Sequence, residues 1–332
     1  MDLKNADDRY RQAATKAVRF WSFTDPVIQI VSVSENVTYR IQALEGVFVL
    51  RLHRPRYHTL QELQSERQWT NALLSSGTTV PRGVETKDGR YYVEVSIGKN
   101  EQRYVGVTNW IEGVPIRHLS NKMTAKQIED QFEKLGEIAA RLHNHSSVWK
   151  MAQDFSRHSF DTEGYFGEKP FWGKYWQSPS LKIVEKRLIL DKTKILREVL
   201  LAYGKNDATY SLIHGDLHFG NVLVRDNETA IIDFDDAGYG WHQYELAVAL
   251  SDDEISHEAD SQSNQEALIR GYRRHRAFSE VAKGLIDSFI LIRAMVSLGW
   301  IEQRPEHRSE LRVRQQVDHI CNLCEMYKEP SL

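Results

Sequence analysis

The stretch LIHGDLHFGN, residues 212–221, places two histidines, an aspartate and an asparagine within ten positions that also hold two glycines. Taken alone, it is compatible with a surface turn in which Asp216 forms a salt bridge. The residues that follow argue against this, because VLVRDNETAIIDF (222–234) has the pattern of a β-hairpin and returns the chain to its starting point. Asp216, Asn221 and Asp233 are therefore expected to converge.

These three side chains suit the transfer of a phosphoryl group from ATP. Such a transfer needs a carboxylate that orients the acceptor hydroxyl, oxygen ligands for Mg²⁺ and cations that contact the phosphates. Asp216 is the candidate base. Asn221 and Asp233 offer the amide and carboxylate oxygens that Mg²⁺ prefers. The sequence thus predicts ATP and Mg²⁺ as cofactors.

The pattern HGDLHFGN…IIDFDD, residues 214–236, resembles the aminoglycoside phosphotransferase and choline kinase-like family, which shares the protein-kinase fold. The resemblance follows nearly the whole chain in order. It implies an α+β, bilobal protein-kinase-like fold, in which a small N-lobe has an antiparallel sheet plus one helix and a larger C-lobe is mainly helical. It also implies that Asp216 is the catalytic base, that Asn221 and Asp233 bind the metal, and that His214 braces the catalytic loop.

Hydrophobic periodicity supports two lobes. The first part of the chain shows helical periodicity, then three β-rich runs, a helix and two further strands, at residues 7–21, 28–34, 38–44, 47–53, 60–77, 89–97 and 103–111. The later part is mainly helical, with helices predicted at 124–146, 181–203, 261–284 and 285–303 and again towards the C-terminus. We expect a nucleotide-binding lobe at 1–108 and a catalytic and acceptor-binding lobe at 109–332.

The N-terminal strands carry the candidates for phosphate contacts. VSENVTYRI lies where the family places its nucleotide-covering loop, and the backbone N–H groups of Ser34 and Asn36 are the candidates to hold phosphates. An ordinary hairpin turn is the alternative. Arg51 stands where protein kinases carry a phosphate-binding lysine, and Glu66 matches the glutamate that pairs with it in the family. Both charges are also compatible with an exposed strand end and an exposed helix face.

The segment VTNWIEG, 107–113, lies where the two lobes are expected to join. Backbone groups of Asn109, Trp110 and Ile111 are candidates to bond the adenine. Packing of Trp110 between the lobes explains the same residue equally well.

The acceptor is less clearly encoded. Asp235, Asp236 and Glu245 favour a cationic acceptor such as an amino alcohol, although they also suit a purely structural role. Arg293, inside the apolar run FILIRAMVSLGW, suits an acidic group instead. The aromatic segment 160–176 is either a wall over the acceptor or a packed loop.

We predict an ATP-dependent kinase that acts on a hydroxyl of a small metabolite of the amino alcohol, hydroxy amino acid or aminoglycoside type. The alternatives are a Ser/Thr protein kinase of the bacterial stress-response type and a nucleotide-binding sensor with low turnover. The net charge of −3 gives no indication of a nucleic-acid partner. The first residues lack the apolar core of a signal peptide and no run is long enough to cross a membrane, so we expect a cytoplasmic protein.

The two cysteines, Cys321 and Cys324, form a CxxC pattern near the C-terminus. A zinc site needs about four ligands, and no second CxxC or HxxxH follows. Their spacing places both on one face of a helix. We therefore expect packing rather than metal or redox chemistry.

Overall fold

The computed structural model describes residues 8–34, 36–97, 101–226, 228–251 and 261–331. The chain divides into two compact units, one formed by residues 1–113, 151–156 and 230–232, the other by 114–150, 157–229 and 233–332. Three parts of predicted turns lie outside the described residues: Glu35 of the covering loop, residues 98–100 and Asn227 of the hairpin.

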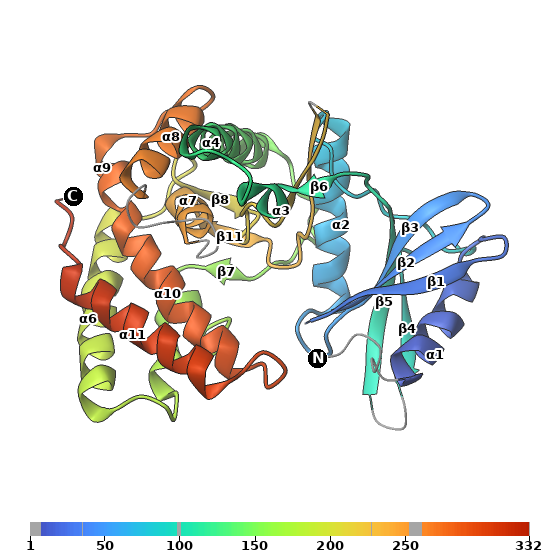
Figure 1. Cartoon of the computed structure of the whole chain (residues 1–332), viewed down its shortest axis with the longest axis horizontal. Coiled ribbons are helices and arrows are strands. Elements are labelled where there is room, and N and C mark those ends of the chain that lie inside the picture. The colour runs from blue at the N-terminus through green and yellow to red at the C-terminus, as the bar shows by residue number, and fades with distance from the viewer. Residues whose placement is uncertain (1–7, 35, 98–100, 227, 252–260, 332) are drawn as a thin grey trace. The chain divides into compact units, whose positions relative to one another are not determined.

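The first unit is built on a five-stranded antiparallel sheet in the order β1-β2-β3-β5-β4 (Figure 1). Its elements are α1 (Asp8–Ala17), a short 3₁₀ turn (Val18–Phe20), β1 (Val27–Val33), β2 (Val37–Ala43), β3 (Gly46–Leu52), α2 (Leu60–Ser75), β4 (Tyr92–Ile97) and β5 (Glu101–Asn109). The predicted meander is confirmed, because β2 pairs antiparallel with both β1 and β3.

Local chemistry explains why these elements form. Alternate residues of β2 are buried, including Tyr39 and Ile41, and join an apolar core with residues of α1 such as Ala14 and Ala17. The helix α2 begins at a capping box in which Thr59 and Glu62 satisfy each other's backbone N–H groups.

The second unit is mainly helical, which confirms the α+β prediction. Its elements are β6 (Val114–Pro115), α3 (Ile116–Ser120), α4 (Ala125–Val148), β7 (Ser159–Phe160), α5 (Thr162–Phe166), a 3₁₀ turn (Tyr175–Gln177), α6 (Ile183–Tyr203), β8 (Tyr210–Ile213), β9 (Val222–Arg225), β11 (Gly238–Trp241), α7 (His242–Leu250), α8 (Ser261–Arg273), α9 (Glu280–Gly284), α10 (Ile286–Glu302) and α11 (Glu310–Met326). The strand β10 (Glu228–Ile231) is shared between the two units.

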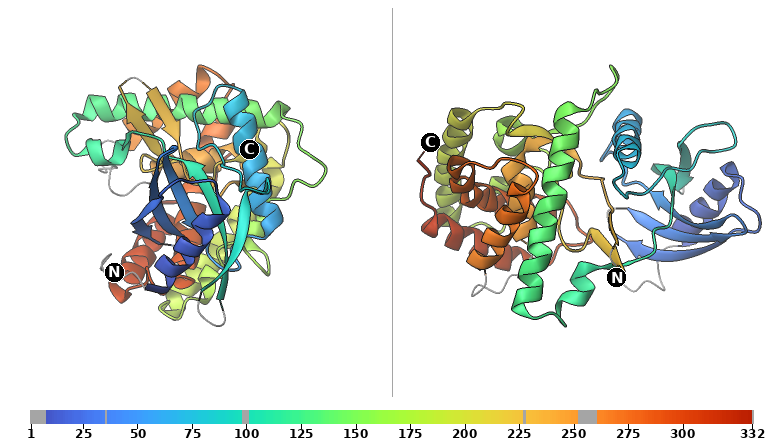
Figure 2. Two further views of the ribbon diagram at one scale, coloured as in Figure 1. Left: turned by 90° about the vertical axis from the view of Figure 1, so that its right-hand side faces the viewer. Right: turned by 90° about the horizontal axis from the view of Figure 1, so that it is seen from above.

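Two glycines allow α4 and α8 to cross closely. A Cβ atom at Gly136 would lie 2.0 Å from the carbonyl oxygen of Leu268. A Cβ at Gly271 would come within overlap distance of the Glu133 carbonyl oxygen. The two helices lie against each other in both views of Figure 2. The long helix α4 also contacts β8, the strand that leads into the loop of the candidate site.

Contrary to the expectation from the sequence, one helical stretch among the described residues, Glu280–Glu302, is long and apolar enough to cross a membrane by length and composition, and 67% of its most apolar window is buried inside the protein. This burial is what the core helix of a folded domain shows. Within it, α10 packs against α7 and α11 (Figure 1).

The predicted packing role of the cysteines agrees with the structure. Both lie on α11 as free thiols, Cys324 buried and Cys321 partly buried. The aromatic segment also packs: Phe160, Tyr165 and Trp172 are buried, and their rings contact the ring of Tyr244 on α7. These three rings are thus part of the core.

Candidate active site

The loop between β8 and β9 presents Asp216. β8 ends at Ile213, and the chain then turns at Gly215, whose φ of +79° lies in the region that favours glycine. A Cβ at this position would lie only 2.6 Å from the carbonyl oxygen of Asp236. Only glycine therefore fits between the loop and the segment that follows Asp233.

The carboxylate of Asp216 has three side-chain partners. Its Oδ1 accepts from Nη2 of Arg293 at 2.7 Å. Its Oδ2 lies 3.2 Å from Nε2 of His218 and accepts from Nδ2 of Asn221 at 3.1 Å. The Asp216 side chain remains 24% exposed, so an acceptor hydroxyl has access to it.

The charge of Asp216 follows from these partners. Burial would raise the pKa of its carboxyl, but His218, Arg293 and His214 together outweigh burial and hold that pKa well below its usual range. The carboxylate is therefore ionised at neutral pH, as a group that accepts a hydroxyl proton must be.

The proposed metal ligands have suitable chemistry. Asn221 is buried, and its Nδ2 donates to both the carbonyl and the carboxylate of Asp216, which leaves its amide oxygen for a cation. Asp233 has a φ of +66°, which is uncommon outside glycine. The next residue, Phe234, packs its ring 4.6 Å from the ring of His214. These donors fit a hard divalent cation such as Mg²⁺.

A glutamate of α7 supports the loop that carries Asp216. Both carboxylate oxygens of Glu245 accept backbone N–H bonds, from His214 at 2.9 Å and from Gly215 at 2.8 Å. His214 is fully buried, and its Nδ1 accepts from the N–H of Asp216 at 3.3 Å. The structural role predicted for Glu245 is therefore a direct support of the backbone that precedes Asp216.

Burial raises the pKa of Glu245 to about 7, against the lowering effect of its two N–H bonds. The ring of His143 lies 4.0 Å away, but burial holds its pKa well below the usual range, so it supplies no positive charge at neutral pH. His143 is instead a packing residue, stacked on His242 and hydrogen-bonded to the Tyr272 hydroxyl.

This raised pKa predicts a pH effect on stability. Because the folded-state pKa of Glu245 exceeds the ordinary value of 4.5, its contribution is present below that value and is lost as the pH rises through about 7. We expect the free energy of unfolding of the wild type, relative to Glu245→Gln, to fall by about 2 to 3 kcal/mol from pH 5 to pH 8. Urea unfolding of both proteins at these pH values measures it, and a difference that stays constant or grows would contradict the assignment.

In the first unit, Arg51 and Glu66 come close to a buried cluster. Arg51 lies on β3 opposite Gly106 of β5, and Glu66 is buried on α2. The charges of Arg67, Glu66 and Arg51 all act on the hydroxyl of the buried Tyr92. Sequence reasoning missed Arg67, a buried cation whose Nη1 donates to the Pro81 carbonyl at 3.2 Å.

The covering loop is tied to the end of β3. The N–H of Ser34 donates to the carbonyl of Asn36 at 3.0 Å, so this donor is engaged within the loop. The side-chain oxygen of the buried Asn36 accepts from the N–H of Arg54 at 2.9 Å. The contacts of this loop with phosphate stay a prediction.

The segment predicted to bind adenine has fewer open backbone groups than expected. The N–H of Asn109 donates to the Arg82 carbonyl at 2.9 Å, and that of Trp110 to the Val47 carbonyl at 3.0 Å. Among the hydrogen bonds of the described residues, the N–H of Ile111 has none. Of the three N–H groups, that of Ile111 is the best candidate to bond the adenine.

The residues predicted to bind the acceptor have contacts of two kinds, one at the backbone of the acidic segment and one at the side chain of Arg293. Arg157, which lies just before β7, donates to the carbonyls of Asp235 and Ala237 and so fixes the backbone of this acidic segment. Arg293 forms an ion pair with Asp216. The two residues are 77 positions apart, and the sequence did not indicate that they would meet. The charge of Asp236 also acts on Arg293.

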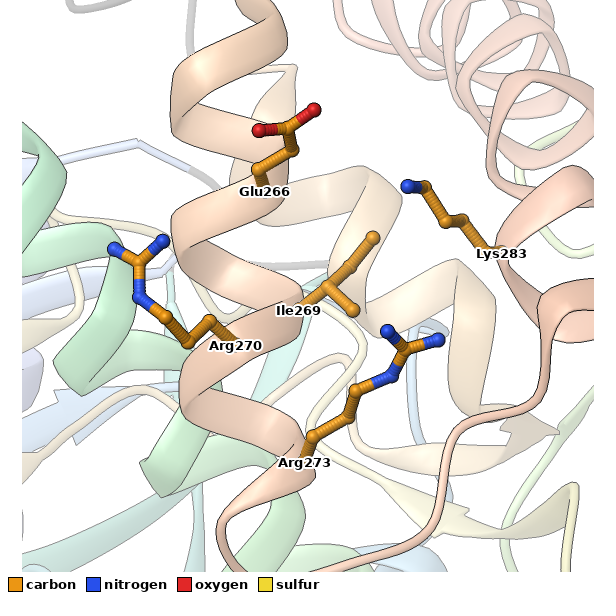
Figure 3. A pocket seen from close by; sticks show the side chains of 5 residues that line it. All are labelled: Glu266, Ile269, Arg270, Arg273 and Lys283. Carbon is orange, nitrogen blue, oxygen red and sulfur yellow. The ribbon is translucent and has the colours of Figure 1, made fainter.

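A separate surface pocket of about 220 Å³ lies on α8 and α9 (Figure 3). Its two arginines are already paired: Arg270 with Glu133 at 2.6 Å, and Arg273 with Glu280 at 2.5 Å. We assign it no role in the reaction.

A sequence model of the phosphotransferase enzyme family matches residues 27–278. The chain belongs to this family. The match confirms the resemblance read from HGDLHFGN…IIDFDD. The matched region of this phosphotransferase includes Asp216, Asn221 and Asp233.

Similar proteins agree with this assignment. A microcompartment-associated aminopropanol kinase superposes on the phosphotransferase with a TM-score of 0.82 and 29% identity, over 95% of each chain. An amicoumacin kinase in complex with AMP-PNP, Ca²⁺ and Ami has a TM-score of 0.79 and 18% identity, over 100% of this chain and 98% of that chain. Stress response kinase A of Escherichia coli (strain K12) is 30% identical over 272 residues, 81% of this chain and 75% of that protein. The predicted protein-kinase-like fold is thereby confirmed.

Proposed function

We propose that this phosphotransferase transfers the γ-phosphoryl group of ATP, with Mg²⁺, to a hydroxyl of a small metabolite. The observation that carries the proposal is the placement of Asp216. Its carboxylate is ionised, 24% exposed and bonded to Asn221, whose amide oxygen is left for a cation. An acceptor hydroxyl and a metal-bound phosphate need such a pair of neighbours.

In the proposed reaction the acceptor oxygen forms a bond to the γ-phosphorus. The bond between that phosphorus and the β–γ bridging oxygen breaks, and ADP leaves with the bridging oxygen. Asp216 orients the hydroxyl and takes its proton as the transfer proceeds. Mg²⁺, when bound, neutralises charge on the phosphate oxygens, and Asn221 and Asp233 are the residues that would hold it. Glu245 keeps the backbone of the loop in place.

We assign nucleotide binding to the N-terminal lobe, residues 1–108. Ser34 and Asn36 would line the phosphates through their loop, and Arg51, supported by Glu66, would contact them directly. The adenine would meet Asn109, Trp110 and Ile111 at the start of the catalytic and acceptor-binding lobe, residues 109–332. The N–H of Ile111 is the favoured donor.

Among the possible acceptors we favour an amino alcohol over a hydroxy amino acid or an aminoglycoside. The similar aminopropanol kinase is named for an amino alcohol. Arg293, the residue that suited an acidic acceptor, is already paired with Asp216. Asp235 and Asp236 add two carboxylates to the segment after Asp233, and carboxylates favour an amine.

A second candidate is a Ser/Thr protein kinase, because stress response kinase A is 30% identical to this chain. A nucleotide-binding sensor with low turnover is the third. The near-neutral composition, with a net charge of −3, gives no support for a nucleic-acid partner. The free thiols of Cys321 and Cys324 and the need for ATP favour a cytoplasmic location.

The test uses purified protein, γ-labelled ATP and Mg²⁺ with separate pools of amino alcohols, hydroxy amino acids, aminoglycosides and protein substrates. Label in one small-molecule pool, lost in Asp216→Asn, is expected and begins to name the acceptor. Label on protein alone would replace the proposal with the protein-kinase alternative. ATP binding without label in any pool would favour the sensor.

A further inference from the structure

We propose that Arg293 is a positioning residue for Asp216: its guanidinium fixes one carboxylate oxygen and thereby sets the direction in which the base meets the acceptor hydroxyl. The inference rests on the proposed function, since it takes Asp216 as the base. It begins from the 2.7 Å contact between Nη2 of Arg293 and Oδ1 of Asp216.

The guanidinium is itself held from several sides. Its Nη1 donates to the hydroxyl of Tyr244 at 3.3 Å, and it lies over the ring of Trp172 at 5.8 Å from the centroid. Both aromatic residues are buried in the packed cluster described above. Arg293 also projects from the interior of α10, between the buried residues Ile292 and Ala294. A charge in this setting is costly unless it is paired, so the ion pair between Arg293 and Asp216 is a built feature of the site.

The hydrogen bonds of Asp216 indicate which oxygen receives the hydroxyl. A carboxylate has about four lone-pair sites. Oδ2 already accepts from His218 and Asn221, at 3.2 and 3.1 Å. Among the side chains of the described residues, Arg293 alone donates to Oδ1, so this oxygen keeps a lone-pair site for the acceptor hydroxyl. Arg293 therefore holds the oxygen that takes the proton.

Recognition of an acidic group on the acceptor is the competing role for Arg293. The charges of Asp216 and Asp236 both act on Arg293 already. An incoming acidic group would have to compete with Asp216 for the guanidinium, which would disturb the base. The contacts therefore favour positioning.

The kinetic test compares Arg293→Gln, Arg293→Lys and Arg293→Ala with the wild type, using the acceptor identified in the labelling experiment. Loss of alignment at the base is expected to lower kcat by about 10- to 100-fold in Arg293→Gln, with KM for ATP within about twofold. Lysine should restore part of kcat, and added guanidinium ions should raise kcat of the alanine variant. A matched control is Arg308→Gln, which removes an arginine paired with Glu302 in the same unit and is expected to leave kcat unchanged.

Two kinetic outcomes would overturn the inference. One is an unchanged kcat in Arg293→Gln. The other is a raised KM for the acceptor at normal kcat, which would make Arg293 a recognition residue. Thermal unfolding of each variant shows whether it still folds. If Arg293→Gln and Arg293→Ala do not fold, kcat of Arg293→Lys, which keeps the charge, is compared with that of the wild type.

A structural measurement decides the inference without any acceptor. Crystal structures of the wild type and of Arg293→Gln would be compared. In the variant, the Asp216 carboxylate is expected to be rotated about its last side-chain torsion relative to the wild type, because this torsion has no steep barrier of its own. An unrotated carboxylate would overturn the positioning role. If the wild type transfers phosphate to no acceptor, the proposed function fails, while this comparison still answers whether Arg293 positions Asp216.

Discussion

Asp216→Asn is expected to lower kcat by about 10²- to 10⁴-fold, the range over which a positioned general base contributes. Asparagine has nearly the same shape as aspartate, so His218, Asn221 and Arg293 keep a partner of the same size. What is lost is the negative charge and the ability to accept the hydroxyl proton. Because Asp216 is not among the residues assigned to the metal or the nucleotide, the dissociation constant for Mg-ATP should stay near that of the wild type.

Steady-state transfer of labelled phosphate measures kcat, and isothermal titration calorimetry measures Mg-ATP binding. Asp226→Asn is a matched control, because this aspartate lies in the exposed turn after β9, outside the candidate site. It should transfer phosphate like the wild type. Full activity in Asp216→Asn would show that another residue is the base.

Substitution of Asp233 is expected to weaken nucleotide binding itself. Asp233→Asn removes an anionic oxygen from the proposed metal site, and we expect the dissociation constant for ATP in Mg²⁺ to rise about tenfold or more, equivalent to roughly 1.4 kcal/mol. The same variant should bind ATP without Mg²⁺ as the wild type does. Calorimetric titrations with and without Mg²⁺ separate these two effects.

The backbone at Asp233 dictates the choice of variant. Its φ of +66° is tolerated by asparagine better than by most residues, so Asp233→Asn removes the charge without adding strain. Asp233→Ala should weaken binding further and also lower the melting temperature. Asp226→Asn again serves as the control, because Asp226 has a similar φ of +55°. Equal loss of ATP binding with and without Mg²⁺ would show that Asp233 does not act through the metal.

Part of the fold follows from local patterns. The β-rich runs at 28–34, 38–44 and 47–53 became β1, β2 and β3, because alternation of apolar residues and tight turns act within a few residues. The helix predicted at 124–146 became α4, which begins at the capping box of Thr124 and Gln127. Short-range patterns are readable because the interactions behind them are short-range.

The helix α7 is one that local sequence patterns did not predict. The segment His242–Leu250 was not predicted as a helix. Only Glu245 within it was singled out, as a residue of the acceptor side or of the structure. Eight of its residues, His242 to Ala249, are buried. A helix that is buried on every side has no polar face, so it lacks the periodicity by which surface helices are recognised.

The sequence by itself determined the family and the three candidate side chains Asp216, Asn221 and Asp233, because one loop and one hairpin carry them. Only the tertiary structure decided what surrounds them. Arg293 reaches Asp216 from a helix 77 residues away, and Glu245 holds the loop backbone from 31 residues away. Such partners are chosen by how helices pack around a buried charge that must be compensated, and no local pattern along the chain records that packing.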